Sequence, residues 1–96
     1  MTQERMPKSL SPIHPGETLR EDVLDPLNMS VHQLAKALGV DSAPLNEIVR
    51  GRRGITADTA LRLARYLGTS AEFWLGLQLD YELRLARRIE AEGDRA

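Results

Sequence analysis

The segment LAKALGVDSAPLNEIVRGRRGIT, from Leu34 to Thr56, contains two short helical patterns separated by a glycine. Leu34, Ala35 and Leu38 recur at the spacing of one helix face, and Gly39 supplies the left-handed conformation that ends a helix without steric cost. A second apolar pattern follows and ends close to three arginines. This spacing predicts two helices that cross over a tight turn, with small residues where the helices approach each other.

The second helix of the pair carries its apolar residues, Leu45 and Ile48, on one face and polar side chains on the other. A recognition helix contacts base edges with the exposed residues of its N-terminal part, while nearby cations and helix N-termini hold phosphates. An asparagine pairs with adenine and a glutamate accepts from the cytosine amine. The residues predicted to contact DNA are Ser30, Ser42, Ala43, Asn46, Glu47, Arg50, Arg52 and Arg53.

Two features leave an alternative to DNA binding open. The second helix begins with Asp-Ser-Ala-Pro (residues 41–44), which offers no long donor side chain, and exposed arginines can simply be solvated on a helical bundle. The net charge of the whole chain is −1, although the segment from Ser30 to Tyr66 contains six cationic and three anionic side chains. The positive charge that could attract DNA is therefore confined to this segment. A protein-interaction module that binds DNA only weakly remains the competing hypothesis.

Capping signals and helical periodicity divide the rest of the chain, and no strand pattern reaches useful length. The predicted fold class is all-α, a five-helix bundle. The first helix is expected to begin at Pro15 and to end at Pro26, and the second to begin with a capping box of Ser30 and Gln33. Asp41 or Ser42 should cap the third helix. The fourth should run from a cap at Thr56 to Gly68, and the last from a capping box of Thr69 and Glu72 to about Glu90.

Length and composition place the chain among small single domains. Its 96 residues suit one domain, which we divide into a flexible lead (1–12), a helix-turn-helix domain with a C-terminal helix (13–90) and a frayed tail (91–96). The absence of cysteine excludes disulfides and thiol-bound zinc. No apolar run approaches the roughly 20 residues that span a bilayer, and the first residues lack the pattern of a secretory signal. We expect a cytoplasmic protein that does not enter membranes.

The sequence offers no set of residues suited to catalysis or metal binding. Its two histidines, His14 and His32, have no second histidine at ligand spacing, and no glycine-rich phosphate loop or nucleophile motif is present. We therefore expect no metal, no cofactor and no enzyme activity.

The last helix carries two apolar stripes. One consists of Leu75, Leu79, Leu83 and Ala86. The other consists of Trp74, Leu77, Tyr81 and Leu85. Because one stripe is enough to cover the core of the domain, the other needs a partner, and we predict a two-fold homodimer through the stripe that begins at Trp74. The alternative is that Trp74 belongs to the core of the monomer. A dimer would place two recognition helices about 34 Å apart and require a palindromic operator.

Two long stretches, HPGETLREDVLDPLNMSVHQLAKALGV (residues 14–40) and NEIVRGRRGITADTALRLARYLGTSAEFWLGLQLDYEL (residues 46–83), resemble the HigA antitoxins, also called the VapI-like group of Xre-type helix-turn-helix proteins. The resemblance implies a lambda-repressor-like DNA-binding domain and a bacterial antitoxin of a type II toxin–antitoxin system. Such a protein dimerises, binds double-stranded operator DNA in its own promoter, represses its operon and pairs with a HigB toxin, a RelE-like ribonuclease that cuts messenger RNA.

The chain departs from this group at residues 41–44, where related proteins more often carry polar or basic residues. Two alternatives follow from the departure. Besides the antitoxin that the resemblance implies, the alternatives are an orphan Xre-type regulator without a toxin gene and a toxin-neutralising module with weak DNA binding.

Overall fold

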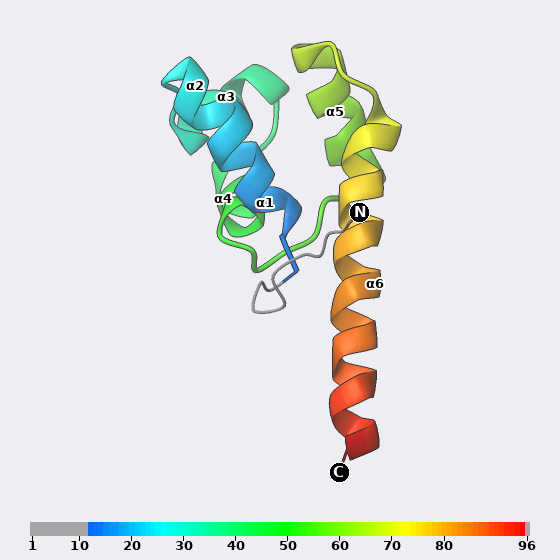
Figure 1. The fold of residues 1–96 in the computed structure, drawn as a ribbon. Coiled ribbons are helices and arrows are strands. Elements are labelled where there is room, and N and C mark those ends of the chain that lie inside the picture. Colours follow the sequence, from blue (N-terminus) through cyan, green and yellow to red (C-terminus); the bar gives the residue numbers. More distant parts are fainter. Residues whose placement is uncertain (1–11, 96) are drawn as a thin grey trace.

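The structure, a computed structural model, describes residues 12–95 and consists of helices joined by short loops, with no strand in that range (Figure 1). Three helical segments follow one another without a break and form the first helix, so the described chain has the five helices that the sequence predicts. The elements are α1 (Pro15–Leu19), η1 (Arg20–Leu24), α2 (Asp25–Leu27), α3 (Val31–Leu38), α4 (Ser42–Val49), α5 (Ala57–Leu67) and α6 (Ala71–Arg95).

Helices α1 to α5 form a head, and α6 lies along one side of it and extends well beyond it (Figure 1). The N-terminal part of α6 contacts α5 and α1. The helix continues to Arg95, past the end that the sequence suggests near Glu90. The predicted flexible lead falls, except for Pro12, outside the described residues, and the proposed division of the chain stays a prediction. No helix among residues 12–95 combines the length and apolar character needed to span a membrane.

The first helix does not end at Pro26, as the sequence suggests, but continues to Leu27. A π turn precedes the proline, and in it the main-chain N–H of Asp25 donates to the carbonyl of Arg20, five residues earlier. A proline ring clashes with the carbonyl four residues before it in a regular α-helix, and a wider turn gives that ring room. The helix ends at Asn28, which adopts the left-handed conformation with φ 54°.

The predicted start and end of α3 are confirmed. Ser30 Oγ accepts the main-chain N–H of Gln33 at 3.0 Å, and Gln33 Oε1 accepts the N–H of Ser30 at 2.8 Å. Gly39, with φ 77°, ends the helix in the left-handed conformation. Asp41 occupies the N-cap position of α4, although its side chain makes no capping hydrogen bond. Each of these helix-capping signals involves residues that are close together in the sequence, so it can be recognised before the fold is known.

The capping box expected from Thr69 and Glu72 is wrong. Ser70 caps α6 instead, because its Oγ accepts the main-chain N–H of Phe73 at 3.0 Å. Thr69 Oγ1 accepts the indole N–H of Trp74 at 2.8 Å. A buried indole N–H needs an acceptor, and this requirement takes the threonine hydroxyl away from the helix end.

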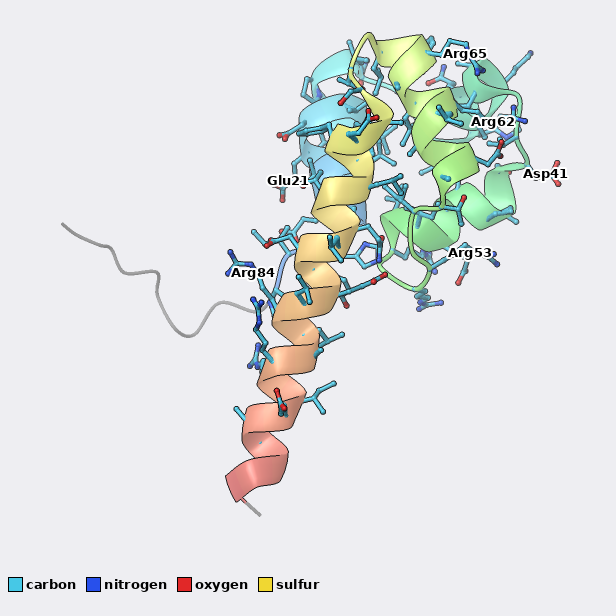
Figure 2. The ribbon with its side chains drawn as sticks, turned by 90° about the vertical axis from the view of Figure 1, so that its right-hand side faces the viewer. Glu21, Asp41, Arg53, Arg62, Arg65 and Arg84 are labelled. Atoms are coloured by element: carbon cyan, nitrogen blue, oxygen red, sulfur yellow. The ribbon has the colours of Figure 1, made fainter. Side chains whose placement is uncertain are left out.

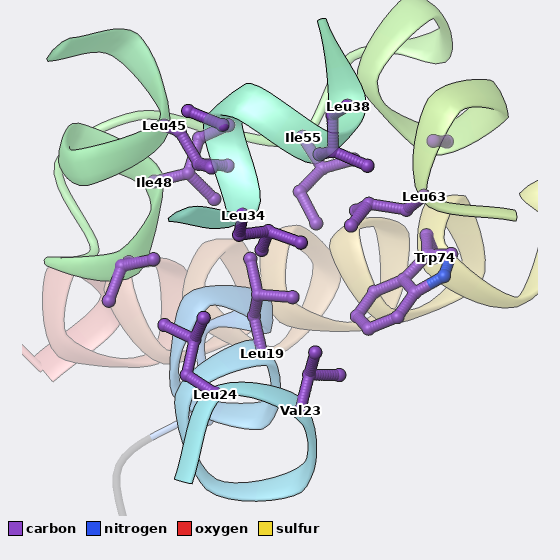
Figure 3. Close-up of a cluster of buried hydrophobic side chains, with 13 residues drawn as sticks. Leu19, Val23, Leu24, Leu34, Leu38, Leu45, Ile48, Ile55, Leu63 and Trp74 are labelled. Atoms are coloured by element: carbon purple, nitrogen blue, oxygen red, sulfur yellow. The ribbon is translucent and has the colours of Figure 1, made fainter. Parts of the chain in front are cut away.

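The core is built almost wholly from aliphatic side chains around one tryptophan (Figure 3). Leu45 and Ile48 fill the wedge between α3 and α4, as predicted, and are 1% and 3% exposed. Buried hydrophobic residues come from every helix and from the loop before α5: Leu19, Val23, Leu24, Leu34, Ala35, Leu38, Leu45, Ile48, Val49, Ile55, Ala60, Leu63 and Trp74.

Helix α1 passes so close to α4 that only glycine fits at the contact. A Cβ atom on Gly16 would overlap the main-chain carbonyl oxygen of Ile48. The carbonyl belongs to the helix that carries the predicted base contacts, so it cannot move away without displacing that helix. Gly16 therefore fixes how closely the first helix supports α4.

We predict that Gly16→Ala lowers the free energy of unfolding by about 1–3 kcal/mol or more, because forcing an extra carbon into a packed interior usually costs that much. Gly76→Ala is the matched control, because no atom lies within 4 Å of a Cβ at this position in α6. Alanine should stabilise a helix by about 1 kcal/mol relative to glycine there. Chemical denaturation of both variants measures the difference, and equal effects would contradict the close contact.

Candidate nucleic-acid interface

The predicted helix-turn-helix is present as α3, a short turn and α4. Ala35 is 2% exposed at the crossing, and its carbonyl accepts the N–H of Val40 at 3.0 Å across the turn. Gly39 provides the second small position, again as predicted. The turn therefore brings α4 against α3 with the apolar residues of both helices directed into the core.

Arg62 of α5 braces this turn. Its Nη1 donates to the carbonyls of Leu38 and Gly39 at 2.9 and 3.3 Å, and its Nε lies 3.1 Å from Asp58 Oδ2. A guanidinium suits the C-terminal carbonyls of α3, which have no partner within their own helix. From the sequence, Arg62 counts among the cationic residues of the basic segment. In the structure its side chain instead stabilises the turn between α3 and α4.

The outer face of α4 is open to solvent. Ala43 and Arg50 are exposed, and Ser42, Asn46 and Glu47 are half-buried at the flanks of the helix. Ser30 is exposed at the N-terminus of α3. The head therefore covers the predicted base-contacting side chains only in part, and the outer face of α4 is accessible to solvent.

We define the arginine loop as Gly51–Thr56, the connection between α4 and α5. Arg52 and Arg53 on this loop are exposed, as is Arg50 at the end of α4, and none of the three forms an ion pair within residues 12–95. Figure 2 shows Arg53 projecting from the head on the side that also carries Arg62, while Arg84 lies on the opposite side of α6. The structure thus places three cations that form no ion pair with another described residue beside the exposed face of α4.

His14 connects the start of α1 to the arginine loop and to α6. Its Nδ1 accepts the main-chain N–H of Gly16 at 2.9 Å, and its ring meets the ring of Tyr81 edge-on, with centroids 4.8 Å apart. Burial lowers the pKa of His14 below its ordinary value of 6.5, and a backbone hydrogen bond with Arg53 offsets part of that shift. The sequence identifies His14 only as the residue before a helix, because its partners lie far along the chain.

The predicted dimer stripe needs correction. Trp74 is 1% exposed within its own chain, so assigning it to a dimer interface is wrong. Leu77 packs against the same core, and Tyr81 packs on His14. Helical periodicity separates two stripes but does not say which one faces the head, and here the stripe with the large aromatic side chain does so. Leu85 is half-buried, and its role in an interface stays a prediction.

The other stripe of α6 is open beyond its first residue, because Leu75 is half-buried against the core and the later residues are exposed. Leu79 and Leu83 are 56% and 42% exposed and lie one helical turn apart. No group of three acidic or histidine side chains that could hold a metal ion occurs within the described part of the chain.

Comparisons with known proteins agree with this geometry. The Helix-turn-helix family model matches residues 19–74, more than half of the chain. Virulence-associated protein I of Dichelobacter nodosus is 58% identical over 76 residues, which are 79% of this chain and 70% of that protein. The structure is also similar to two antitoxins solved with DNA.

The first of these is the Pseudomonas aeruginosa antitoxin HigA with the higBA promoter, at 49% identity and a TM-score of 0.77, covering 88% of this chain and 89% of the other. The second is the antitoxin GraA in complex with its operator, at 43% identity and a TM-score of 0.80, covering 93% and 90%.

We predict that replacing Arg50, Arg52 and Arg53 together by alanine abolishes the mobility shift of the DNA upstream of the chain's own gene. Every phosphate that is no longer bound should also make the slope of log affinity against log salt shallower by about 0.9. The control replaces Arg84, Arg87 and Arg88 by alanine, which removes the same charge from exposed positions of α6. A shift that survives the first set of substitutions, or falls equally with both, would refute the interface.

Proposed function

Because the chain belongs to the Xre-type helix-turn-helix family, in the group that includes HigA antitoxins and virulence-associated protein I, we propose that it is the antitoxin of a HigBA-like type II toxin–antitoxin system. In this proposal it acts in the cytoplasm, represses transcription of its own operon and neutralises a RelE-like toxin that cuts messenger RNA. The family consists of DNA-binding regulators without enzyme activity.

One observation carries the proposal. The exposed face of α4 lies beside three arginines that have no ion-pair partner in the described chain, on a fold similar to antitoxins solved with a promoter or an operator. In such an arrangement the helix enters the major groove and the flanking cations meet the phosphates on either side.

Within the groove, each side chain has a role set by its chemistry. Asn46 pairs with adenine, Glu47 accepts from a cytosine amine, and Ala43 packs on a thymine methyl group, with Ser42 beside them. Arg50 and the two arginines of the loop hold phosphates. Ser30 caps the N-terminus of α3, where main-chain N–H groups of the first turn face a further phosphate. Phosphate contacts thus supply most of the affinity, and four short side chains supply the base preference.

The proposal includes a homodimer through α6. Leu79 and Leu83 form an exposed apolar pair on a helix that extends beyond the head. A second copy covers such a pair symmetrically in a two-fold contact. Two copies related in this way would hold two α4 helices about 34 Å apart, so the operator is expected to be palindromic.

We predict that Leu79→Asp combined with Leu83→Asp yields a monomer in sedimentation velocity, because four carboxylates would then meet at the two-fold contact. The wild-type slope of log affinity against log salt should be about −5 to −7 for six to eight phosphate contacts, and the monomer should show about half of it. Leu61→Asp is the control, since this leucine is 53% exposed on α5 of the head. A dimer that survives the paired substitution would place the interface elsewhere.

We predict further that co-expression of this chain restores growth to cells that express a small basic toxin encoded by the neighbouring gene. The variant lacking Arg50, Arg52 and Arg53 should still rescue growth while losing repression of a promoter fusion, because the two activities would use different surfaces.

Other outcomes separate the alternatives. The absence of a toxin gene, together with repression, identifies an orphan regulator. Growth rescue by a wild-type chain that never shifts its promoter DNA identifies a neutralising module with weak DNA binding.

A further inference from the structure

We propose that Gln78 of α6 is a positioning residue for DNA binding, which holds the arginine loop where Arg52 and Arg53 meet the phosphates. The inference rests on the DNA-binding part of the proposed function. Gln78 itself faces the interior of the molecule and touches no DNA. It acts through the main chain of the loop.

Gln78 is the one polar residue that is buried among residues 12–93, with 9% of its surface exposed. Its Oε1 accepts the main-chain N–H of Ile55 at 2.8 Å, across 23 residues of sequence. Its Nε2 donates to Glu82 Oε2 at 2.9 Å, one turn further along α6. Both ends of the amide are thus satisfied, and the second bond fixes which end faces the loop.

Gly54 lies directly on the Gln78 amide. A Cβ at Gly54 would stand 2.9 Å from Nε2 and 3.1 Å from Cδ of Gln78, closer than side chains normally approach. The loop therefore contacts the amide through its bare main chain, and the next residue, Ile55, is 4% exposed in the core. Together these contacts fix the position of the C-terminal half of the loop.

The N-terminal half of the loop depends on α4. The main-chain N–H of Gly51 donates to the carbonyl of Ile48 at 3.0 Å, and that of Arg52 donates to the carbonyl of Glu47 at 2.8 Å. Arg53 lies between this anchor and the one at Gln78. Since the side chains of Arg52 and Arg53 have no ion-pair partner among the described residues, the main-chain anchors, together with the hydrogen bond of His14 to the backbone of Arg53, set where their charges stand relative to α4.

The geometry therefore explains why loss of one buried amide should weaken DNA binding. Without the acceptor, the N–H of Ile55 is left unpaired in the interior, and the loop must move to hydrate it. A charge-assisted hydrogen bond to phosphate needs an N–O distance of about 2.7–2.9 Å, which a displaced loop does not provide. A stability effect alone would not act through the arginines, and this difference makes the role testable.

The experiment is a double-mutant cycle with Gln78→Met, which keeps the length of the side chain and removes the acceptor. Affinity for the operator is measured in the wild-type chain and in a chain carrying Arg52→Ala and Arg53→Ala, under conditions where circular dichroism shows each variant folded. We expect Gln78→Met to weaken binding about tenfold in the wild-type chain and to have no further effect in the second background. The salt slope should become shallower by about 0.9 for every phosphate that the displaced loop no longer binds.

Two further measurements complete the design. Hydrogen exchange of the Ile55 amide in the free protein should accelerate in Gln78→Met while the amides of α4 stay protected. The paired variant Gln78→Glu with Glu82→Gln restores an acceptor for Ile55 and a donor at the neighbouring position of α6, and should recover at least part of the affinity.

An equal reduction of affinity in both backgrounds, or unchanged exchange at Ile55, would overturn the role of Gln78. Failure of the wild-type chain to bind its operator would instead overturn the proposed function, and the exchange measurement would still decide whether Gln78 holds the loop.

Discussion

The packing of Trp74 against the head is the contact on which the rest of the structure depends. This side chain is 1% exposed and donates its indole N–H to Thr69 at the start of α6. Removing a buried aromatic side chain typically costs about 3–5 kcal/mol, a large share of the roughly 5–15 kcal/mol that stabilises a whole domain. With Trp74 in place, the next turns of α6 bring Gln78 and Tyr81 against the arginine loop and His14. The helix that closes the core thus also supports the arginine loop, which belongs to the predicted DNA-binding surface.

The distribution of charge matters more here than its total. A chain with a net charge of −1 has little general attraction for nucleic acid. One arginine of the basic middle segment, Arg62, is used to cap α3, and three others stay free of internal partners beside α4 within the described residues. Attraction to phosphates is therefore expected beside the helix that is predicted to contact the bases. In such a molecule the placement of a few arginines matters more for binding DNA than the net charge of the chain.

Sequence reasoning succeeds here where the deciding contacts are local. Three predicted features depend only on neighbours within four positions in the sequence. They are the capping box at Ser30, the glycine that ends α3 and the helical spacing of the apolar residues in α4. Sequence reasoning fails where a contact joins distant segments: Gln78 meets Ile55 across 23 residues, and Arg62 meets Leu38 across 24. The same limit explains the wrong stripe on α6, because periodicity is a property of the helix alone, whereas the choice of face is made by the head.

The imidazole of His14 has a consequence for behaviour in acid. Only a neutral ring can accept the N–H of Gly16 at Nδ1, and burial favours that form by lowering the pKa below 6.5. The stabilising contribution is therefore complete above pH 6.5 and is lost as the pH falls through the pKa of the folded state. Acidification therefore weakens the contact at the start of α1, whereas the hydrogen bond with the backbone of Arg53, which raises the pKa, favours the protonated ring. An NMR titration of the two histidine rings follows this transition directly.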